Sequence, residues 1–226
     1  MAMPGAKIAN RPLHFFWLVD TSYSMDGDKI QSLNQAIKDT IPVMQDESDN
    51  YPEVRLMVRV IKFSNHAEWL IADPVEIHDF EWNDLSVDGM TAMGEALELV
   101  ADAFSKMKKE RAIPPVVALI TDGYATDDFM SGLDKLNKEP WGKKCIRIAI
   151  GVGENVEEDE LKTFVGERGQ YIPVRNTSQL IAAIKWVSTV VVQTSSSSEV
   201  KNSEEAGQGT DLEYIPDEDV STDEVW

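Results

Sequence analysis

Apolar residues along the chain follow two alternating patterns that together predict an α/β domain. Short, largely apolar runs lack a polar face and are typical of strands buried on both sides of a parallel sheet. These runs cover residues 15–19, 116–121, 145–152 and 171–174. Helices that bury one face are indicated by apolar spacings of three and four. The predicted helices cover residues 28–47, 92–109, 127–138, 156–165 and 178–192. We therefore predict a doubly wound α/β fold, with a mostly parallel central sheet and helices on both faces.

Two neighbouring runs depart from the parallel pattern. Residues 54–63 alternate two sets of side chains, with Val54, Leu56, Val58 and Val60 on one face and Arg55, Met57, Arg59 and Ile61 on the other. A three-residue connection leads to a second run at 67–71. Strands joined this tightly are antiparallel. The short second strand, followed by Asp73 and a proline, suits an edge of the sheet. Residues 73–89 show no period and predict a long loop. Pro42 is expected to kink or end the first predicted helix.

The stretch LHFFWLVDTSYSM carries the strongest chemical signal. A buried strand ends in Asp20, and Ser22 and Ser24 follow at every second position. In an extended turn these side chains project to one side, where a carboxylate and two hydroxyls suit Mg²⁺, with Mn²⁺ or Ca²⁺ as alternatives. The motif DTSYS itself has no His or Cys, which argues against zinc. The other interpretation is an aspartate that caps a helix and serines that satisfy loop amides. A second buried run also ends in aspartate, at Asp122.

Composition narrows the classes of function. The 226 residues carry a formal net charge of −19, which disfavours nucleic acid and anionic membranes as partners. The N-terminus lacks the apolar core of a signal peptide, and no run reaches the roughly 18 apolar residues of a membrane span. We therefore expect a cytoplasmic protein. The single cysteine, Cys145, lies in an apolar run and is expected to be a buried strand residue.

The composition changes after the last predicted helix. We predict an N-terminal extension over residues 1–12, one domain over 13–193 and a disordered acidic tail over 194–226. From Glu199 onward the tail has ten acids and one lysine, which gives it a charge of −9. Two interpretations stay open. The tail is either a solvated leash or a docking segment for a partner or for the metal site itself, open to phosphorylation at Ser203, Ser221 or Thr222.

Three motifs resemble the metal-ion-dependent adhesion site of von Willebrand factor A (vWA) domains. They are DTSYS at residues 20–24, GMTAMGEAL at 89–97 and ALITDG at 118–123. The order of strands and helices between residues 15 and 192 is similar to that family, which implies the Rossmann-like vWA fold. The phrase TDGYATDD is most similar to intracellular bacterial vWA proteins of the TerY type, named for tellurite resistance. That likeness implies a role in stress response or signalling beside a protein kinase and a metal-dependent protein phosphatase.

The resemblance implies five metal ligands on three loops. The first loop would supply Asp20, Ser22 and Ser24, the second Thr91 and the third Asp122. In the family the hydroxyls bind the metal directly in a ligand-bound state, and the carboxylates hold it directly or through water. Three neutral hydroxyls and two carboxylates leave Mg²⁺ electrophilic toward an outside oxygen. An Asp or Glu of a protein partner would then complete the coordination.

Side chains around this site are expected to select the partner. Tyr23 and Met90 stand where the family commonly has glycine, so they enlarge the rim. The predicted rim consists of the loop 73–89 and of Tyr23, Met25, Met90 and Tyr124. Trp82 is either a packing residue or part of a recognition surface. Glu95 either supports the metal ligands from behind or is a solvated helical acid.

These observations predict a non-enzymatic interaction module. The alternative is a phosphatase of the haloacid dehalogenase type, which also places an aspartate beside Mg²⁺ at the end of a parallel strand. Such an enzyme needs a second acid two residues on, where Ser22 stands, and a lysine near the third strand. Lys143 and Lys144 begin a strand at the opposite end of the sheet. We therefore expect no enzyme activity.

Overall fold

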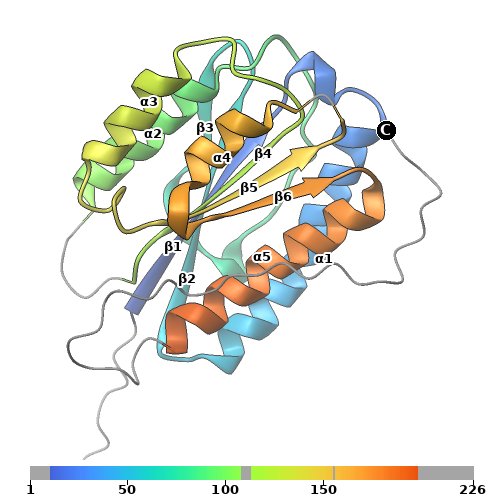
Figure 1. Cartoon of the computed structure of the whole chain (residues 1–226). Helices are drawn as coiled ribbons and strands as arrows, with labels where there is room; N and C mark the ends of the chain where they lie inside the picture. The colour runs from blue at the N-terminus through green and yellow to red at the C-terminus, as the bar shows by residue number, and fades with distance from the viewer. Residues whose placement is uncertain (1–10, 108–112, 155, 198–226) are drawn as a thin grey trace, which may run out of the picture.

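Six strands form one sheet in the part of the chain described by the computed structural model, which covers residues 11–107, 113–154 and 156–197. They are β1 (Arg11–Asp20), β2 (Val54–Phe63), β3 (Ala67–Glu76), β4 (Val116–Thr121), β5 (Ile146–Val152) and β6 (Gln170–Val174). Their spatial order is β3-β2-β1-β4-β5-β6, and each neighbouring pair is parallel except β2 and β3. The predicted doubly wound α/β fold is confirmed (Figure 1).

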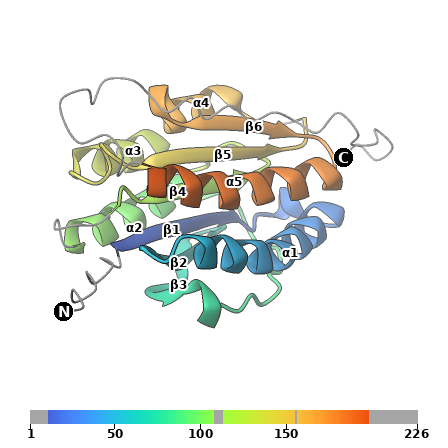
Figure 2. The ribbon, with the colours of Figure 1, turned by 90° about the horizontal axis from the view of Figure 1, so that it is seen from below.

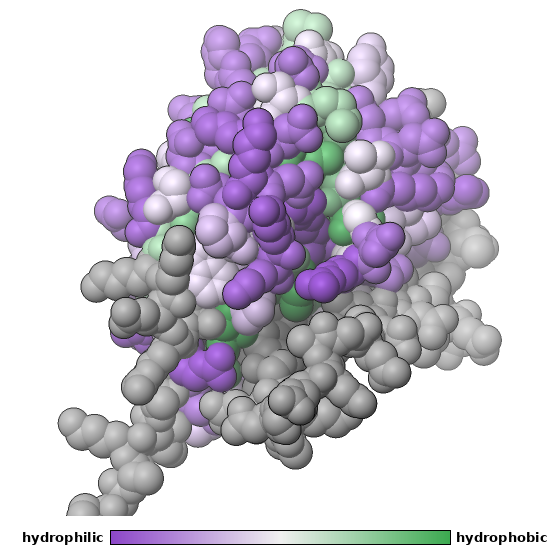
Figure 3. Space-filling view, turned by 60° about the vertical axis from the view of Figure 1, so that its left-hand side comes forward, coloured by the Kyte–Doolittle hydropathy of each residue, from purple (hydrophilic) through white to green (hydrophobic). Residues whose placement is uncertain are grey.

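Two layers of helices cover the sheet. One face carries α1 (Asp28–Asn50) and α5 (Thr177–Ser197), which pack side by side (Figure 2). The other face carries α2 (Met93–Lys106), α3 (Phe129–Lys138) and α4 (Glu158–Val165). The face of the molecule turned forward in Figure 3 is mostly hydrophilic. This is the surface expected of helices that turn only their apolar side to the sheet.

β1 lies at the centre of the core, between β2 and β4. Its side chains alternate, so that Phe15 and Trp17 pack in the layer of α1 and α5, while Phe16 and Leu18 pack in the layer of α2. All four side chains have no solvent exposure. Burying each of them stabilises the fold by about 1.5–3 kcal/mol. This packing fixes the strand firmly, and with it the position of Asp20 at the carboxyl end of β1.

α1 continues through Pro42 to Asn50, so the expectation that Pro42 ends this helix is wrong, while the alternative of a kink stays a prediction. Pro42 is exposed, and the carbonyl that loses its helical N–H partner can therefore be hydrated. Ile37 and Met44, on either side of the proline, are buried against the core. Their packing compensates for the missing hydrogen bond and carries the helix past the proline.

β3 reaches Glu76, so the predicted edge strand is too short and the predicted loop over 73–89 begins too early. The register between β2 and β3 shifts on either side of Val60, and residues 72–74 lie opposite Arg59 alone. An edge strand tolerates such a bulge because one of its sides has no neighbouring strand. Its proline has no N–H to donate, and at a bulge on an edge strand this costs no hydrogen bond between strands. A short 3₁₀ turn, Ile77–Asp79, follows β3.

The observed elements reach slightly beyond the predicted domain limits of residues 13 and 193. β1 begins at Arg11, and α5 ends at Ser197. Residues 1–10 and 198–226 lie outside the described residues, and the predictions about the acidic tail therefore remain predictions. Within the described ranges, no helix is long and apolar enough to cross a membrane.

The carboxyl ends of β1 and β4 lie next to each other at one edge of the sheet. The chain leaving β1 enters α1 on one face, whereas the chain leaving β4 enters α3 on the other. Ligands of open α/β sheets bind in the crevice at such a switch point. The first and third motif loops therefore meet where a ligand is expected.

Candidate metal centre

Three loops are joined by backbone hydrogen bonds at this edge of the sheet. The N–H of Asp88 donates to the carbonyl of Thr21 at 2.7 Å, and the N–H of Tyr23 donates to the carbonyl of Gly89 at 3.1 Å. Gly89 has a φ of 72°, and a Cβ there would lie 2.4 Å from the side chain of Asn65. Only glycine fits this position. These backbone hydrogen bonds thus hold the first and second loops together without a metal ion.

The second and third loops are joined in the same way. The N–H of Thr126 donates to the carbonyl of Thr91 at 2.9 Å, and the N–H of Thr91 donates to Oγ1 of Thr126 at 3.0 Å. The carboxylate of Asp127 accepts hydrogen bonds from the N–H groups of Gly94 and Glu95, at 2.9 and 2.8 Å. Asp127 therefore caps the first turn of α2 from the third loop. These bonds hold Thr91 beside the end of β4.

Asp20 is fully buried at the end of β1. Its carboxylate accepts a hydrogen bond from the N–H of Ser22 at 2.8 Å and one from Oγ1 of Thr121 at 2.5 Å. Burial raises the pKa of Asp20 to about 6, although these hydrogen bonds oppose the shift. A carboxylate desolvated in this way is stabilised by a nearby cation.

A continuous row of oxygen atoms leads from the first loop to the third. Oγ of Ser22 lies 2.9 Å from Oγ of Ser24, which in turn donates to Oδ1 of Asp122 at 2.6 Å. Ser22 and Asp122 are both buried. The 3₁₀ turn Tyr23–Met25 between β1 and α1 gives the serines this spacing. Hydrogen bonds thus link two hydroxyls of the first loop to a carboxylate of the third.

Thr91 completes the group. A Cβ placed on Gly123 would lie 3.8 Å from both Oγ of Ser24 and Oγ1 of Thr91, so these two hydroxyls face the same point. The structure therefore brings all five predicted ligands, Asp20, Ser22, Ser24, Thr91 and Asp122, to one edge of the sheet. Their oxygen-only donor set fits a hard divalent cation. The described residues contain no cluster of three or more His, Cys, Asp or Glu side chains that could hold a metal. A cation held here would therefore be bound by hydroxyl oxygens as well as by carboxylates.

Three of the four single residues predicted for the rim are exposed. Tyr23, Met90 and Tyr124 have 65%, 58% and 62% of their surface accessible. The prediction for Met25 is wrong, because this side chain is fully buried in the core on the side of α1. The 3₁₀ turn directs Met25 inward while it directs Tyr23 outward. Each of the three loops thus carries one large exposed side chain beside the candidate site.

Two residues left open by the sequence are now placed. Trp82 is a packing residue, since it is buried and its indole N–H donates to Oδ1 of Asn34 at 3.1 Å. The carboxylate of Glu95 accepts a hydrogen bond from the N–H of Ala67 at 3.1 Å and lies 3.3 Å from Nδ1 of His66. Glu95 therefore ties α2 to the connection between β2 and β3, and it does not support the metal ligands.

Lys29 is a site residue that the sequence reasoning missed. Its Nζ lies 2.6 Å from Oδ2 of Asp122 and 3.3 Å from the carbonyl oxygen of Ser24. Lys143 and Lys144, the lysines weighed for the enzyme alternative, precede β5 at the opposite end of the sheet. The available signal was the position of Lys29 in the first turn of the helix that follows DTSYS.

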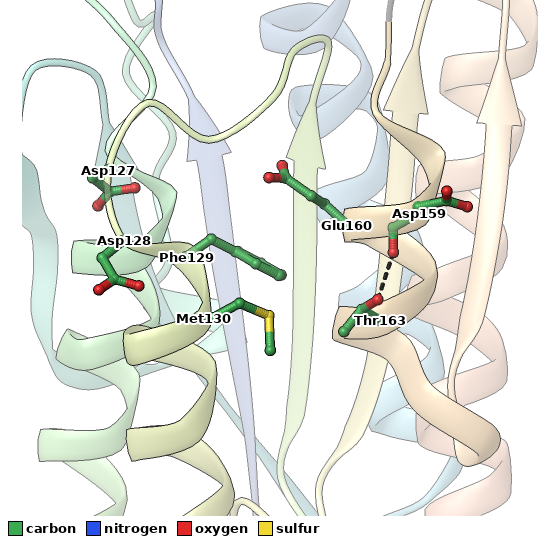
Figure 4. A pocket seen from close by; sticks show the side chains of 7 residues that line it. All are labelled: Asp127, Asp128, Phe129, Met130, Asp159, Glu160 and Thr163. Atoms are coloured by element: carbon green, nitrogen blue, oxygen red, sulfur yellow. Dashed lines mark hydrogen bonds between the residues drawn. The ribbon is translucent and has the colours of Figure 1, made fainter.

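An acidic cavity of about 350 Å³ lies between α3 and α4, beyond the third loop. Figure 4 shows Asp127, Asp128, Phe129 and Met130 on one side and Asp159, Glu160 and Thr163 on the other. Several of its acids have structural roles. Asp128 accepts a hydrogen bond from the N–H of Ser131 and caps α3, and Glu160 accepts one from the N–H of Ala125. Asp127 caps α2 as described above. These acids therefore stabilise helix ends and the third loop.

Comparison with known structures agrees with the observed fold. Similar structures include a von Willebrand factor type A protein from Catenulispora acidiphila, with 18% identity and a TM-score of 0.64, covering 80% of this chain and 43% of that chain. BatB from Bacteroides thetaiotaomicron has 16% identity and a TM-score of 0.57, covering 81% and 100%. Proximal thread matrix protein 1 from the mussel byssus, with a zinc-occupied MIDAS motif, has 18% identity and a TM-score of 0.58, covering 82% and 46%.

At these identities the likeness shows the fold alone. This chain spans less than half the length of the Catenulispora and mussel proteins. No curated protein matches it by sequence. The family model described as von Willebrand factor type A domain, however, matches residues 16–185, which is most of the chain. The chain therefore belongs to the von Willebrand factor type A domain family.

Proposed function

We propose that this protein is a non-enzymatic interaction module that binds an acidic side chain of a partner protein through a divalent cation. One observation carries the proposal: two carboxylates and three hydroxyls from three separate loops converge at the carboxyl ends of β1 and β4. Membership of the vWA family supports it, because domains of this family commonly mediate metal-dependent protein interactions. The MIDAS motif of the mussel protein holds zinc in its structure. In this chain the oxygen-only donor set favours Mg²⁺, with Mn²⁺ or Ca²⁺ as alternatives.

The five residues have two kinds of role. Asp20 and Asp122 supply negative charge, while the hydroxyls of Ser22, Ser24 and Thr91 offer neutral oxygens. When bound, the cation would supply a Lewis-acidic position for an outside oxygen. A carboxylate of the partner suits that position best, because the three hydroxyls are neutral oxygens and leave the cation electrophilic toward an anionic ligand. The net charge of −19 repels an acidic partner at long range, but salt screens this repulsion beyond about 10 Å.

The rim would supply specificity. Tyr23, Met90 and Tyr124 are three of the large apolar or aromatic side chains that are exposed in the described residues. Exposed aromatic and methionine side chains are enriched at protein interfaces. We propose that they contact residues on either side of the partner's acid. A partner segment with apolar neighbours around an Asp or Glu fits this surface.

The finer assignment rests on the resemblance of residues 16–45 and of the phrase TDGYATDD to TerY-type proteins. On this assignment the protein belongs to a cytoplasmic stress-response or signalling assembly, together with a protein kinase and a metal-dependent protein phosphatase. Copurification of the full chain with such a kinase and phosphatase, retained in Mg²⁺ and released by EDTA, would support this context. Binding that is unaffected by EDTA would contradict it.

A peptide array tests the proposed function directly. Each peptide carries one Asp or Glu and is matched with the same peptide bearing Asn or Gln. The full chain should bind a subset of the acidic peptides in Mg²⁺ and none of their amide counterparts, and EDTA should abolish the binding. Thr91→Ala should weaken it, since this change removes one hydroxyl ligand. Thr163→Ala is the matched control, because Thr163 is an exposed residue of α4. Equal binding in Mg²⁺ and EDTA would exclude the proposal.

The enzyme alternative gains no support from the family or from the similar structures. Ser22 stands where a haloacid dehalogenase phosphatase needs its second acid, and its side chain is hydrogen bonded to Ser24. We therefore expect no hydrolysis of a chromogenic phosphate monoester in Mg²⁺. Hydrolysis that disappears in Asp20→Asn would overturn this expectation.

A further inference from the structure

Lys29 places a positive charge at the oxygen atoms that a metal would use. The residue lies in the first turn of α1, and its side chain reaches across to the end of β4. Its Nζ lies 2.6 Å from Oδ2 of Asp122, while Oδ1 of the same carboxylate accepts the hydroxyl of Ser24. Nζ also donates to the carbonyl oxygen of Ser24 at 3.3 Å. The ammonium is therefore bound to two residues of the site.

The Lys29 side chain passes over Gly153, which follows the carboxyl end of β5. A Cβ on Gly153 would lie 3.6 Å from both Cε and Nζ of Lys29, so the lysine passes directly over this glycine. Gly153 has a φ of 88°, a conformation that favours glycine. The end of the lysine side chain thus lies against the chain that leaves β5, next to the end of β4.

The pair is poorly screened by solvent. The Asp122 side chain has no exposure, and 19% of the Lys29 side chain is accessible. At such a site an ammonium and a divalent cation that share one carboxylate repel each other strongly. If both lie within bonding distance of Asp122, their mutual repulsion cancels most of the attraction between the carboxylate and the two cations. Lys29 is 19% exposed and has a flexible four-carbon stem, so it can turn outward.

We infer that Lys29 is an internal competitor of the metal. Its ammonium neutralises Asp122 while no metal is bound, and it must leave Asp122 before the cation binds. This inference rests on the proposed function and assigns a regulatory residue to the same site. Lys29 lowers the affinity for the metal alone. A partner carboxylate adds its own bond to the bound cation and so shifts the equilibrium toward the metal-bound, lysine-released state. Metal and partner therefore bind cooperatively, each raising the affinity for the other.

The test compares Lys29→Met with Lys38→Met in the full chain. Methionine keeps an unbranched stem over Gly153 and removes the ammonium. Lys38 also lies on α1, but it pairs with Asp84 at the surface, where 40% and 60% of the two side chains are exposed. Both variants change the net charge equally, so long-range attraction of cations changes equally. Calorimetric titration with Mg²⁺ should show about tenfold tighter binding by Lys29→Met and little change in Lys38→Met.

Thermal unfolding gives a second readout. In EDTA, Lys29→Met should melt below the wild type, because Asp122 loses its counter-ion. In saturating Mg²⁺ this difference should disappear or reverse, since the lysine has already left in the metal-bound wild type. Lys29→Gln, which keeps a polar end, repeats both measurements if the methionine variant folds poorly.

Three results would overturn the inference, and they have different meanings. If the wild type binds Mg²⁺ and neither Lys29 variant binds it more tightly, Lys29 does not compete with the metal and the proposed function survives. If neither the wild type nor the variants bind Mg²⁺ or Mn²⁺, both the inference and the proposed function fail. A destabilisation of Lys29→Met that is equal in EDTA and Mg²⁺ would also contradict the competition.

Discussion

Oγ1 of Thr121 donates a 2.5 Å hydrogen bond to Oδ2 of Asp20, which joins the last residue of β4 to the last residue of β1 beneath the candidate site. Both residues are fully buried. Asp20 is therefore more than a prospective ligand in a loop, since its carboxylate also holds two strand ends together. Asp122 differs, because its partners Ser24 and Lys29 come from the first loop and α1.

Thr121→Val should destabilise the protein by about 1–3 kcal/mol, the usual cost of leaving a buried acceptor without its donor. Valine keeps the shape of threonine, so the change isolates the hydroxyl. Urea unfolding in EDTA measures the free energy of unfolding. Thr163→Val is the control, because Thr163 is exposed on α4. An equal free energy of unfolding for the two variants would show that the bond to Asp20 contributes nothing.

His14 makes stability depend on pH. Burial, together with the charges of Arg59 and Arg55, lowers the pKa of His14 to about 4, and its Nδ1 is buried without a hydrogen-bond partner in the described residues. The folded state therefore disfavours the protonated ring. Stability from the neutral ring is complete above the ordinary pKa of about 6.5 and is lost as the pH falls toward about 4.

His14→Leu should remove this dependence. Its stability relative to the wild type should rise by on the order of 1 kcal/mol when the pH falls from about 7.5 to about 5, after allowance for the partial exposure of the ring. Urea unfolding at the two pH values measures the difference. A constant difference between variant and wild type would contradict the assignment.

The acidic tail should not contribute to stability. Its sequence has too few apolar residues to offset the entropy of ordering it. Truncation after Ser197, where α5 ends, should therefore change the melting temperature by less than about 2 °C. A truncation after residue 193, which also removes the last four residues of α5, is the variant for comparison. A large fall in melting temperature for the first truncation would show that the tail packs on the domain.

The sequence predicted the fold and the meeting of the first and third loops because both follow from local patterns. Fully apolar runs identify central parallel strands, and parallel strands bring their carboxyl ends to one edge. Asp20 and Asp122 each stand at or just after such an end, so their proximity follows from strand order. Thr91 needed the resemblance to the vWA family, because nothing in its own surroundings marks it as a ligand.

The features that the sequence reasoning missed depend on three-dimensional placement. Lys29 reaches Asp122 only because of the way α1 lies over the ends of β4 and β5. Met25 is buried because a 3₁₀ turn follows β1, and alternation in an extended chain would have exposed it. The length of β3 depends on a bulge opposite Arg59, which the irregular sequence around Asp73 conceals.

Calorimetric titration of the metal-free full chain with Mg²⁺ tests the central claim most directly, with Asp122→Asn and Asp134→Asn as the paired variants. Asparagine keeps the shape of Asp122 and removes its charge, while Asp134 is an exposed acid of α3 away from the three loops. The wild type and Asp134→Asn should bind one ion per chain with similar affinity, and Asp122→Asn should bind at least about tenfold more weakly. Equal affinities in all three proteins, or no binding by the wild type at millimolar Mg²⁺, would contradict the assignment of a metal site to these loops.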